Sequence, residues 1–366
     1  MSESDVYQLL DHAADLPYGP ERVALVEEAV RLADLSGSED LSYQAHIELV
    51  DAANWSGLGD RSVVAFAWCL AYYDRKMASS DAHFDYDTLL WRFKWVLRAL
   101  PNNPGISRAQ IVQMEDQLES RLIDAGYNAH TINYLQCLNR LDFGDHEEAA
   151  TYYTQWHLLP RDGLADCHAC ELDNEVTYHA TLQKDAEAVR LAKLLISGEL
   201  SGCTEVPHRT YATIIQPLMR LRRSDELEQT HREGIRKISG LPALARDVAE
   251  HLIYLVSIRN LPRAMQLIDR FLTKPAILAN FNSLFKLQNS VAITLEAVAD
   301  NSKRKRKLRL PSFLPCHRDD HTYDTTELAA WFRSSASELA NQFDTRNGNS
   351  MHKAAMTETR ELAGIE

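Results

Sequence analysis

An interval of close to forty residues repeats along this chain and restricts its possible folds more than any other feature. The segment 144–153 contains Gly144, a small residue five positions later (Ala149) and a large residue four further on (Tyr153). Comparable pairs follow: Ala188 with Ala192, Leu227 with His231, and Ala264 with Ile268, so that the first members are 39, 39 and 37 residues apart. Such a period is typical of stacked helical hairpins, each of which buries its apolar face against its neighbours.

The earlier part of the chain fits the same frame. Gly19 with Ala24 and Gly59 with Val64 are 40 residues apart, and Ala109 falls near the place expected for a further step. Apolar residues recur at helical spacing within the segments: Val23, Val26, Ala29, Val30 and Ala33 in 20–34, and Ala264, Leu267, Ile268 and Phe271 in 262–272. Sustained strand-like alternation is absent, so an all-α protein is predicted.

The glycine, small and large positions resemble those of tetratricopeptide (TPR) repeats, over roughly residues 18–300. In that family the glycine ends a first helix and the small residue lets the two helices approach closely. The resemblance implies an α-solenoid of TPR-like helical hairpins. The period exceeds the usual 34 residues, and Arg or Gln occupies several glycine positions. HEAT-like or other helical repeats are therefore the alternative.

Four regions are predicted along the chain. Residues 1–300 form the TPR-like array, in which 276–299 is the last hairpin helix. Residues 301–323 form a basic and polar loop, because the run 303–309 and two prolines interrupt the apolar pattern. Residues 324–345 form a C-terminal capping helix that begins with the capping box Asp324–Glu327. The polar remainder, 346–366, is predicted to be a mobile tail.

The strongest chemical signal is a C-x-x-C pair, Cys167 and Cys170, followed by Cys203 and His208. Two thiolates of such a pair can bind one tetrahedral zinc ion, and the second pair can supply the other ligands. One repeat of 39 residues after Cys167 falls between Cys203 and His208, which places both pairs at equivalent turns of neighbouring hairpins. These four residues are the predicted metal ligands of a structural zinc site, with His157 and Asp166 as spare ligands.

Two other interpretations of the cysteines stay open: small buried residues at crowded turns, and a C-x-x-C redox pair. The segment Cys316–His321 also contains metal-binding residue types, but it lacks paired spacing and is interpreted as a polar loop. Cys69 and Cys137 lie on apolar helical faces and are predicted to belong to the core.

A closer resemblance involves three segments: 161–170, 203–208 and 343–348. They look like segments of uncharacterised bacterial TPR proteins, familiar mainly from actinobacteria. This resemblance implies a helical-repeat fold and no known catalytic activity, and it supplies no functional residues.

Composition and motifs restrict the possible binding partners, cellular location and activities of the protein. The formal net charge is -13, which disfavours a general nucleic-acid binder, although the basic run 303–309 is a local exception. The acidic start is not that of a secretory signal, and no apolar run would span a bilayer, so a cytoplasmic location is expected. Phosphate loops, hydrolase elbows and zinc-protease helices are absent from the sequence.

The predicted function is therefore a scaffold or adaptor that binds a protein or peptide, with a regulatory role as a close variant. First helices line the inner face of a solenoid, so residues 40–55, 86–100 and 128–141 are the expected binding surface. Aromatic residues between Trp68 and Trp95 either pack between hairpins or anchor the bound segment. The alternative function is a metal-dependent enzyme that uses the Cys/His site, and a closed four-ligand site would argue against it.

Overall fold

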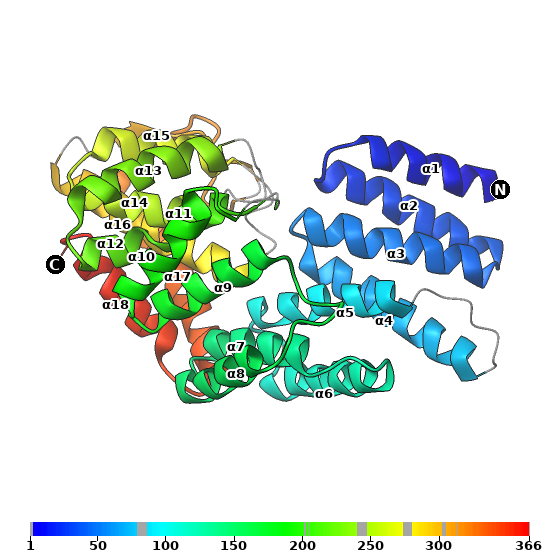
Figure 1. Cartoon of the computed structure of the whole chain (residues 1–366). Helices are drawn as coiled ribbons and strands as arrows, with labels where there is room; N and C mark the ends of the chain where they lie inside the picture. Colours follow the sequence, from blue (N-terminus) through cyan, green and yellow to red (C-terminus); the bar gives the residue numbers. More distant parts are fainter. Residues whose placement is uncertain are drawn as a thin grey trace. The chain divides into compact units, whose positions relative to one another are not determined.

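The protein is all-α apart from one short hairpin of strands in its described part (Figure 1). The computed structural model describes residues 3–78, 86–200, 203, 205–239, 247–273, 280–301, 305–312 and 314–365. The chain divides into two compact units. The first comprises Met1–Asn139, Thr151–Ala165 and Leu278–Asn280, and the second comprises Arg140–Ala150, Asp166–Ile277 and Phe281–Glu366. None of the described helices is both long and apolar enough to cross a bilayer.

Consecutive antiparallel helices build the first unit, and Figure 1 shows α1 to α3 lying side by side. Its elements are α1 (Glu3–Asp15), α2 (Pro20–Ser36), α3 (Glu39–Trp55), α4 (Gly59–Ala78), α5 (Tyr86–Ala99), the 3₁₀ turn η1 (Leu100–Asn102) and α6 (Arg108–Asp124). Each helix packs on the next, and α3 also contacts α1 and α5. The hairpin of α7 (His130–Phe143) and α8 (His146–Leu158) is divided between the two units.

The second unit continues the alternation. It contains α9 (His168–Thr181), α10 (Asp185–Ile196), α11 (His208–Thr213), α12 (Ile215–Arg220), α13 (Ser224–Ile238), α14 (Val248–Ser257), α15 (Leu261–Phe271), α16 (Phe281–Asn301), β1 (Lys305–Lys307), β2 (Thr322–Asp324), α17 (Thr325–Asn347) and α18 (Met351–Leu362). The pairs α9 with α11, α12 with α14 and α14 with α16 pack together as first helices of neighbouring hairpins, and α10 packs on α12 of the next hairpin. This packing agrees with an all-α helical repeat, whereas its curvature into a solenoid stays a prediction.

The repeated turn is a left-handed residue that ends the first helices α7, α9, α12 and α14. Gly144, Gln183, Arg222 and Arg259 have φ values of 81°, 54°, 55° and 58°. At Arg222 the turn is a Schellman motif, because its N–H donates to the Met219 carbonyl (3.0 Å) and the next N–H donates to the Leu218 carbonyl (3.1 Å). The same pair of bonds recurs at the other three positions. The Arg and Gln residues thus occupy the glycine positions of the repeat in the conformation that glycine favours.

The fourth residue of each second helix is buried against its hairpin partner. Ala149, Ala188 and Ala264 are fully buried and Leu227 nearly so, as the repeat predicts. The earlier assignments of Ala24, Val64 and Ala109 are wrong, because these side chains are exposed. Gly19 precedes α2 directly and Gly59 is the first residue of α4, so neither glycine ends a first helix. The buried fourth positions are instead Val23, Ser62 and Ile111.

Two predictions for the C-terminal region need correction. The predicted loop 301–323 contains β1, which pairs antiparallel with β2 across residues 305–307 and 322–324. The predicted mobile tail 346–366 contains α18, which packs on α12, α14, α16 and α17. A helix, α17, is present where the capping helix was predicted: the Asp324 carboxylate accepts hydrogen bonds from the Thr326 and Glu327 N–H groups, and α17 packs along α16. Its role as a cap of the array stays a prediction. Residues 303 and 304 of the basic run lie outside the described residues.

Candidate metal centre

The C-x-x-C pair lies at the start of α9, within the N-cap and first turn of the helix. Cys167 is the N-cap, with extended backbone (φ −60°, ψ 150°). Its Sγ accepts a hydrogen bond from the Cys170 N–H at 3.3 Å. Sulfur thus takes the place of the Ser or Asp oxygen that usually caps a helix. Local helix geometry therefore positions the pair without help from a metal.

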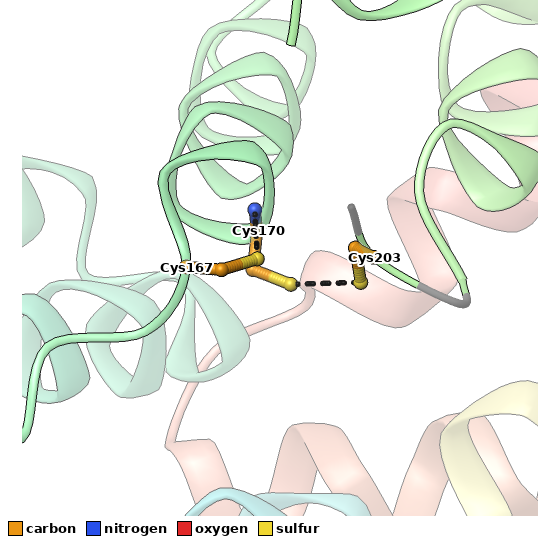
Figure 2. Close-up of side chains that lie close together, drawn as sticks. All are labelled: Cys167, Cys170 and Cys203. Carbon is orange, nitrogen blue, oxygen red and sulfur yellow. Dashed lines mark hydrogen bonds between the residues drawn. The ribbon is translucent and has the colours of Figure 1, made fainter. Parts of the chain in front are cut away.

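Cys203 joins this pair from the segment before α11, one repeat further along the chain. Its Sγ lies 3.2 Å from that of Cys170, and the ligand atoms of all three cysteines lie within 4.8 Å of one another. Figure 2 shows the three side chains converging from two segments of the chain. Helices α9 and α11 pack together, which explains how residues 33 apart meet. We call this group the three-thiol cluster.

Hydrogen bonding polarises the cluster. Burial raises the pKa of Cys170, and its hydrogen bonds with Cys167 and Cys203 raise it further. Burial also raises the pKa of Cys203, but hydrogen bonds from Cys170, from the backbone N–H groups of Glu205 and Val206, and from Cys167 outweigh it, so that the net pKa is lowered. Cys203 is therefore the position where a thiolate is stabilised. Cys167 is exposed, which leaves one side of the cluster open to solvent.

The donor set suits a thiophilic metal ion. Zinc thiolates place sulfur about 2.3 Å from the metal, so three sulfurs already within 4.8 Å of one another need only small side-chain adjustments to share one ion. No fourth ligand belongs to the group among the described residues: His208, His157 and Asp166 are outside it. The predicted four-residue site is thus brought together in three of its members.

His208 is the first residue of α11, and its side chain has different surroundings. Burial lowers its pKa, and the charge of Lys237 lowers it further, against the opposing effect of Glu205. Its Nδ1 is buried without a hydrogen-bond partner. The C-x4-H pattern predicted His208 as a ligand from its separation from Cys203 along the sequence. The position of the ring in space depends instead on the turn that leads into α11.

The other cysteines are separate from the cluster. Cys69 and Cys137 are fully buried, and burial raises the pKa of each to about 12, which makes them inert thiols of the core. Burial raises the pKa of Cys316 to about 11, and its side chain packs against the core of the second unit. No metal-ligand group forms around Cys316 among the described residues.

A second candidate site consists of aromatic rings on α3, on α5 and in the turn before α2 of the first unit. Tyr18, before α2, lies 6.2 Å from Trp55, measured between ring centroids. Trp55 lies 5.3 Å from Trp95, which lies 6.4 Å from Trp91. Tyr18 and Trp55 remain 47% and 38% exposed, unlike Tyr72 and Phe93, which are core residues. We call these four rings the aromatic ladder. Phe84 of the predicted aromatic group lies outside the described residues.

Charged groups flank the aromatic ladder. The Arg22 guanidinium lies 4.3 Å from the centre of the Tyr18 ring, and the Lys94 Nζ lies 3.8 Å from that of Trp91. Arg92 pairs with Asp51 at 2.5 Å. Glu48, one helical turn before Asp51 on α3, is exposed. Trp55 and Tyr18 were absent from the predicted aromatic group, although Trp55 lies at helical spacing from Glu48 and Asp51.

No known protein family matches the chain, and no curated protein matches it. The fold and the two sites define it as an all-α, helical-repeat-like protein with a three-cysteine cluster able to hold a metal ion.

Proposed function

We propose that the protein is a TPR-like interaction scaffold that captures an extended segment of another protein on α3 and α5. The observation that carries this proposal is the aromatic ladder, which is partly exposed on two helices of the predicted binding surface. Trp and Tyr are the residue types most often responsible for binding energy in interfaces. Rings that a hydrophobic core does not cover offer large contact area at small entropic cost.

The ladder favours a partner segment of particular chemistry. Surfaces lined by aromatic rings accommodate proline or other apolar side chains of an extended peptide. Glu48 and the formal net charge of -13 favour a Lys or Arg beside them. Of the three predicted surfaces, 40–55 and 86–100 contribute the ladder. The third, 128–141, contributes little exposed surface, because Thr131, Gln136 and Asn139 of α7 are buried.

The experiment is site-specific photocrosslinking in the native host. A photoreactive phenylalanine analogue at Trp95 should crosslink a partner, whereas the same group at Leu158, an apolar residue that is 77% exposed in the same unit, should not. Adducts identified by mass spectrometry should disappear when Trp55→Ala is added. Crosslinks confined to α18 or to the basic segment 305–309 would overturn this placement.

We propose, second, that the three-thiol cluster holds one structural zinc ion that joins α9 to the segment before α11. The support is the donor set itself, three cysteine sulfurs from two segments. Zinc would neutralise thiolate charge and add its binding energy to the folding of the second unit.

The resemblance to bacterial TPR proteins and the six free cysteines support a bacterial cytoplasmic location.

The alternative function, a metal-dependent enzyme, would rest on the open side of the same cluster. Catalytic zinc has three protein ligands and one exchangeable position. X-ray absorption spectroscopy of the zinc-loaded protein separates the two cases. A closed coordination shell that ignores added anions supports a structural role, and a light-atom ligand that exchanges with azide supports the enzyme.

A further inference from the structure

A pocket of about 280 Å³ lies between α17 and α18 of the second unit. Arg333, Ser337 and Asn341 line it from α17. Lys353, Thr357 and Arg360 line it from α18. The intervals of four along α17, and of four and three along α18, place each set on one face of its helix. The two faces are opposed, so six polar side chains converge on one space.

The charge of the pocket is unbalanced. Its lining contains three cationic side chains and no carboxylate. Glu296 of α16 binds two of the cations: its Oε1 accepts from Arg333 Nε and its Oε2 from Arg360 Nη1, both at 2.5 Å. One carboxylate thus holds two guanidinium groups together. Lys353 is exposed and makes no ion pair within the described ranges.

The Nη2 of Arg333 also lies against Glu296 Oε1. Glu296 therefore offsets one of the three positive charges of the lining, and a net excess of cations remains. The excess is notable in a protein whose formal net charge is -13, where local cations are usually matched by carboxylates.

The remaining lining groups suit a small organic anion. Ser337, Asn341 and Thr357 offer neutral hydrogen-bonding groups around the cations. Met356 lines the pocket and packs against the apolar cluster of Phe285, Ala336, Leu339 and Ala340. The pocket therefore joins a cationic wall to a partly apolar one.

We propose that this pocket binds a small phosphate monoester. A phosphate group near neutral pH carries close to two negative charges and three acceptor oxygens, enough for Arg333, Lys353 and Arg360 together. Guanidinium groups bind phosphate through paired hydrogen bonds, and lysine adds a point charge. Met356 would contact the organic part of the ester. The pocket belongs to the second unit, so this binding is separate from capture of a protein segment on the aromatic ladder.

Calorimetric titration of the full chain tests the proposal, with glycerol 3-phosphate as the probe and acetate at matched ionic strength as the comparison. Glycerol 3-phosphate should bind saturably at one site and acetate should not. Lys353→Met should weaken binding about tenfold or more, since a hydrogen bond to a charged group is lost. Lys307→Met removes the same charge from β1, outside the pocket, and should leave binding unchanged.

Three results would overturn the proposal. Absence of saturable binding would show that the ion network is structural only. Equal weakening by both lysine variants would show diffuse attraction to surface charge. Equal affinity for acetate would exclude phosphate as the ligand class. Both substitutions are at exposed positions, and circular dichroism melting of each variant confirms that the fold is retained before binding is compared.

Discussion

Individual thiols of this protein differ in reactivity because their neighbours differ. Burial is the main cause of the raised pKa values of Cys69 and Cys137, and it outweighs the opposing charges of Arg92 near Cys69 and of Arg98 near Cys137. Cys203 is also partly buried, but two thiols and two backbone N–H groups donate to its sulfur. Metal binding needs thiolate ligands. The cluster therefore supplies at Cys203 the form of cysteine that a metal binds, whereas the core cysteines do not.

Substitution within the three-thiol cluster should release zinc and destabilise the protein. Cys170→Ser removes the central sulfur, so its zinc content should fall from about one equivalent to near zero, and its melting temperature should fall with it. Cys316 is a partly buried cysteine outside the cluster. The Cys316→Ser variant should therefore keep the zinc content and the melting temperature of the wild type. Elemental analysis of protein purified without metal-affinity resin measures the zinc, and melting with a chelator measures its contribution. If the wild-type protein contained less than about half an equivalent of zinc, and chelator did not change its melting temperature, the zinc site would be contradicted. The three cysteines would then be ordinary packing residues.

A contacting pair of histidines, one fully buried (His251) and one half-buried (His231), should make the second unit sensitive to acid. The Nδ1 atoms of His231 and His251 lie 3.1 Å apart. Burial, with a contribution from Arg263, lowers the pKa of His231 to about 4. Burial lowers the pKa of His251 well below its usual value, and His231 lowers it further. The folded state therefore binds fewer protons than the unfolded state, whose histidines titrate near about 6.5.

The sign of the acid effect follows from this difference. The contribution to stability is complete above about pH 6.5 and is lost as the pH falls toward 4. Urea midpoints of the wild type should thus drop between pH 7 and pH 5, and His231→Gln should drop less. His12→Gln, at an exposed position of α1, should keep the wild-type dependence. A His231→Gln profile that matches the wild type would show that other groups cause the acid sensitivity.

At the scale of elements, the repeated turns contain strain that glycine would relieve. Arg222 is exposed and left-handed (φ 55°), a conformation that costs a residue with a Cβ about 1 kcal/mol. Arg222→Gly should therefore raise the free energy of unfolding by about 0.5–1 kcal/mol. Arg232→Gly, at an exposed position inside α13, should lower it by about 1 kcal/mol. Denaturant unfolding of both variants measures the difference, and a shared sign would contradict this explanation.

The same turns show what sequence periodicity can predict. The 39-residue interval identified the second-unit hairpins because Ala149, Ala188 and Ala264 occupy equivalent helix positions. In the first unit the assigned small-residue positions lay one or two residues from the buried positions that the structure shows. Glycine has two roles at helix ends, and the sequence does not distinguish a residue such as Gly144, which ends a helix, from one such as Gly19, which precedes a helix. Periodicity therefore found the helices more reliably than the turns.

Contacts between distant residues explain the remaining errors. The α18 helix has few buried side chains, so its composition resembles that of a tail. Its start is held by Asp344, whose carboxylate accepts from the His352 and Lys353 N–H groups. Asn349 donates to the Phe143 carbonyl, 206 residues away, at 2.6 Å. A local sequence pattern does not reveal contacts between residues that lie so far apart in the chain. Cys167 and Cys170 were identified because C-x-x-C is a local motif, and Cys203 because it lies close to one repeat further on. His208 lies outside the three-thiol group, because its position depends on the α11 turn.

At the scale of the whole molecule, the two units draw most of their buried apolar residues from different helices. The first unit packs the apolar faces of α1 to α6. The core of the second unit is a large cluster drawn from α9 to α17. In helical arrays each element contacts mainly its neighbours, so stability is approximately a sum of local terms. A change in one unit is expected to alter local opening in that unit first.

Removal of α18 tests this expectation. A chain that ends at Asn349 keeps the bond to Phe143 but loses Ala363, which packs with Ile253, Val256 and Ile293, and loses the Arg220–Glu358 ion pair. The melting temperature should fall by about 5 °C or more, because this core becomes exposed. An unaltered melting temperature would instead support the prediction from composition that residues 346–366 form a mobile tail.

Hydrogen exchange read by mass spectrometry separates the units in the same truncated chain. Amides of α12, α14 and α16 should lose protection, because these helices pack on α18. Amides of α1 to α4 should exchange as in the wild type. Phe66→Ala, which removes a buried ring of the first unit, is the matched control and should produce the reverse pattern. If both changes accelerate exchange equally in all helices, the protein unfolds as one cooperative body, and the division into two units does not extend to its energetics.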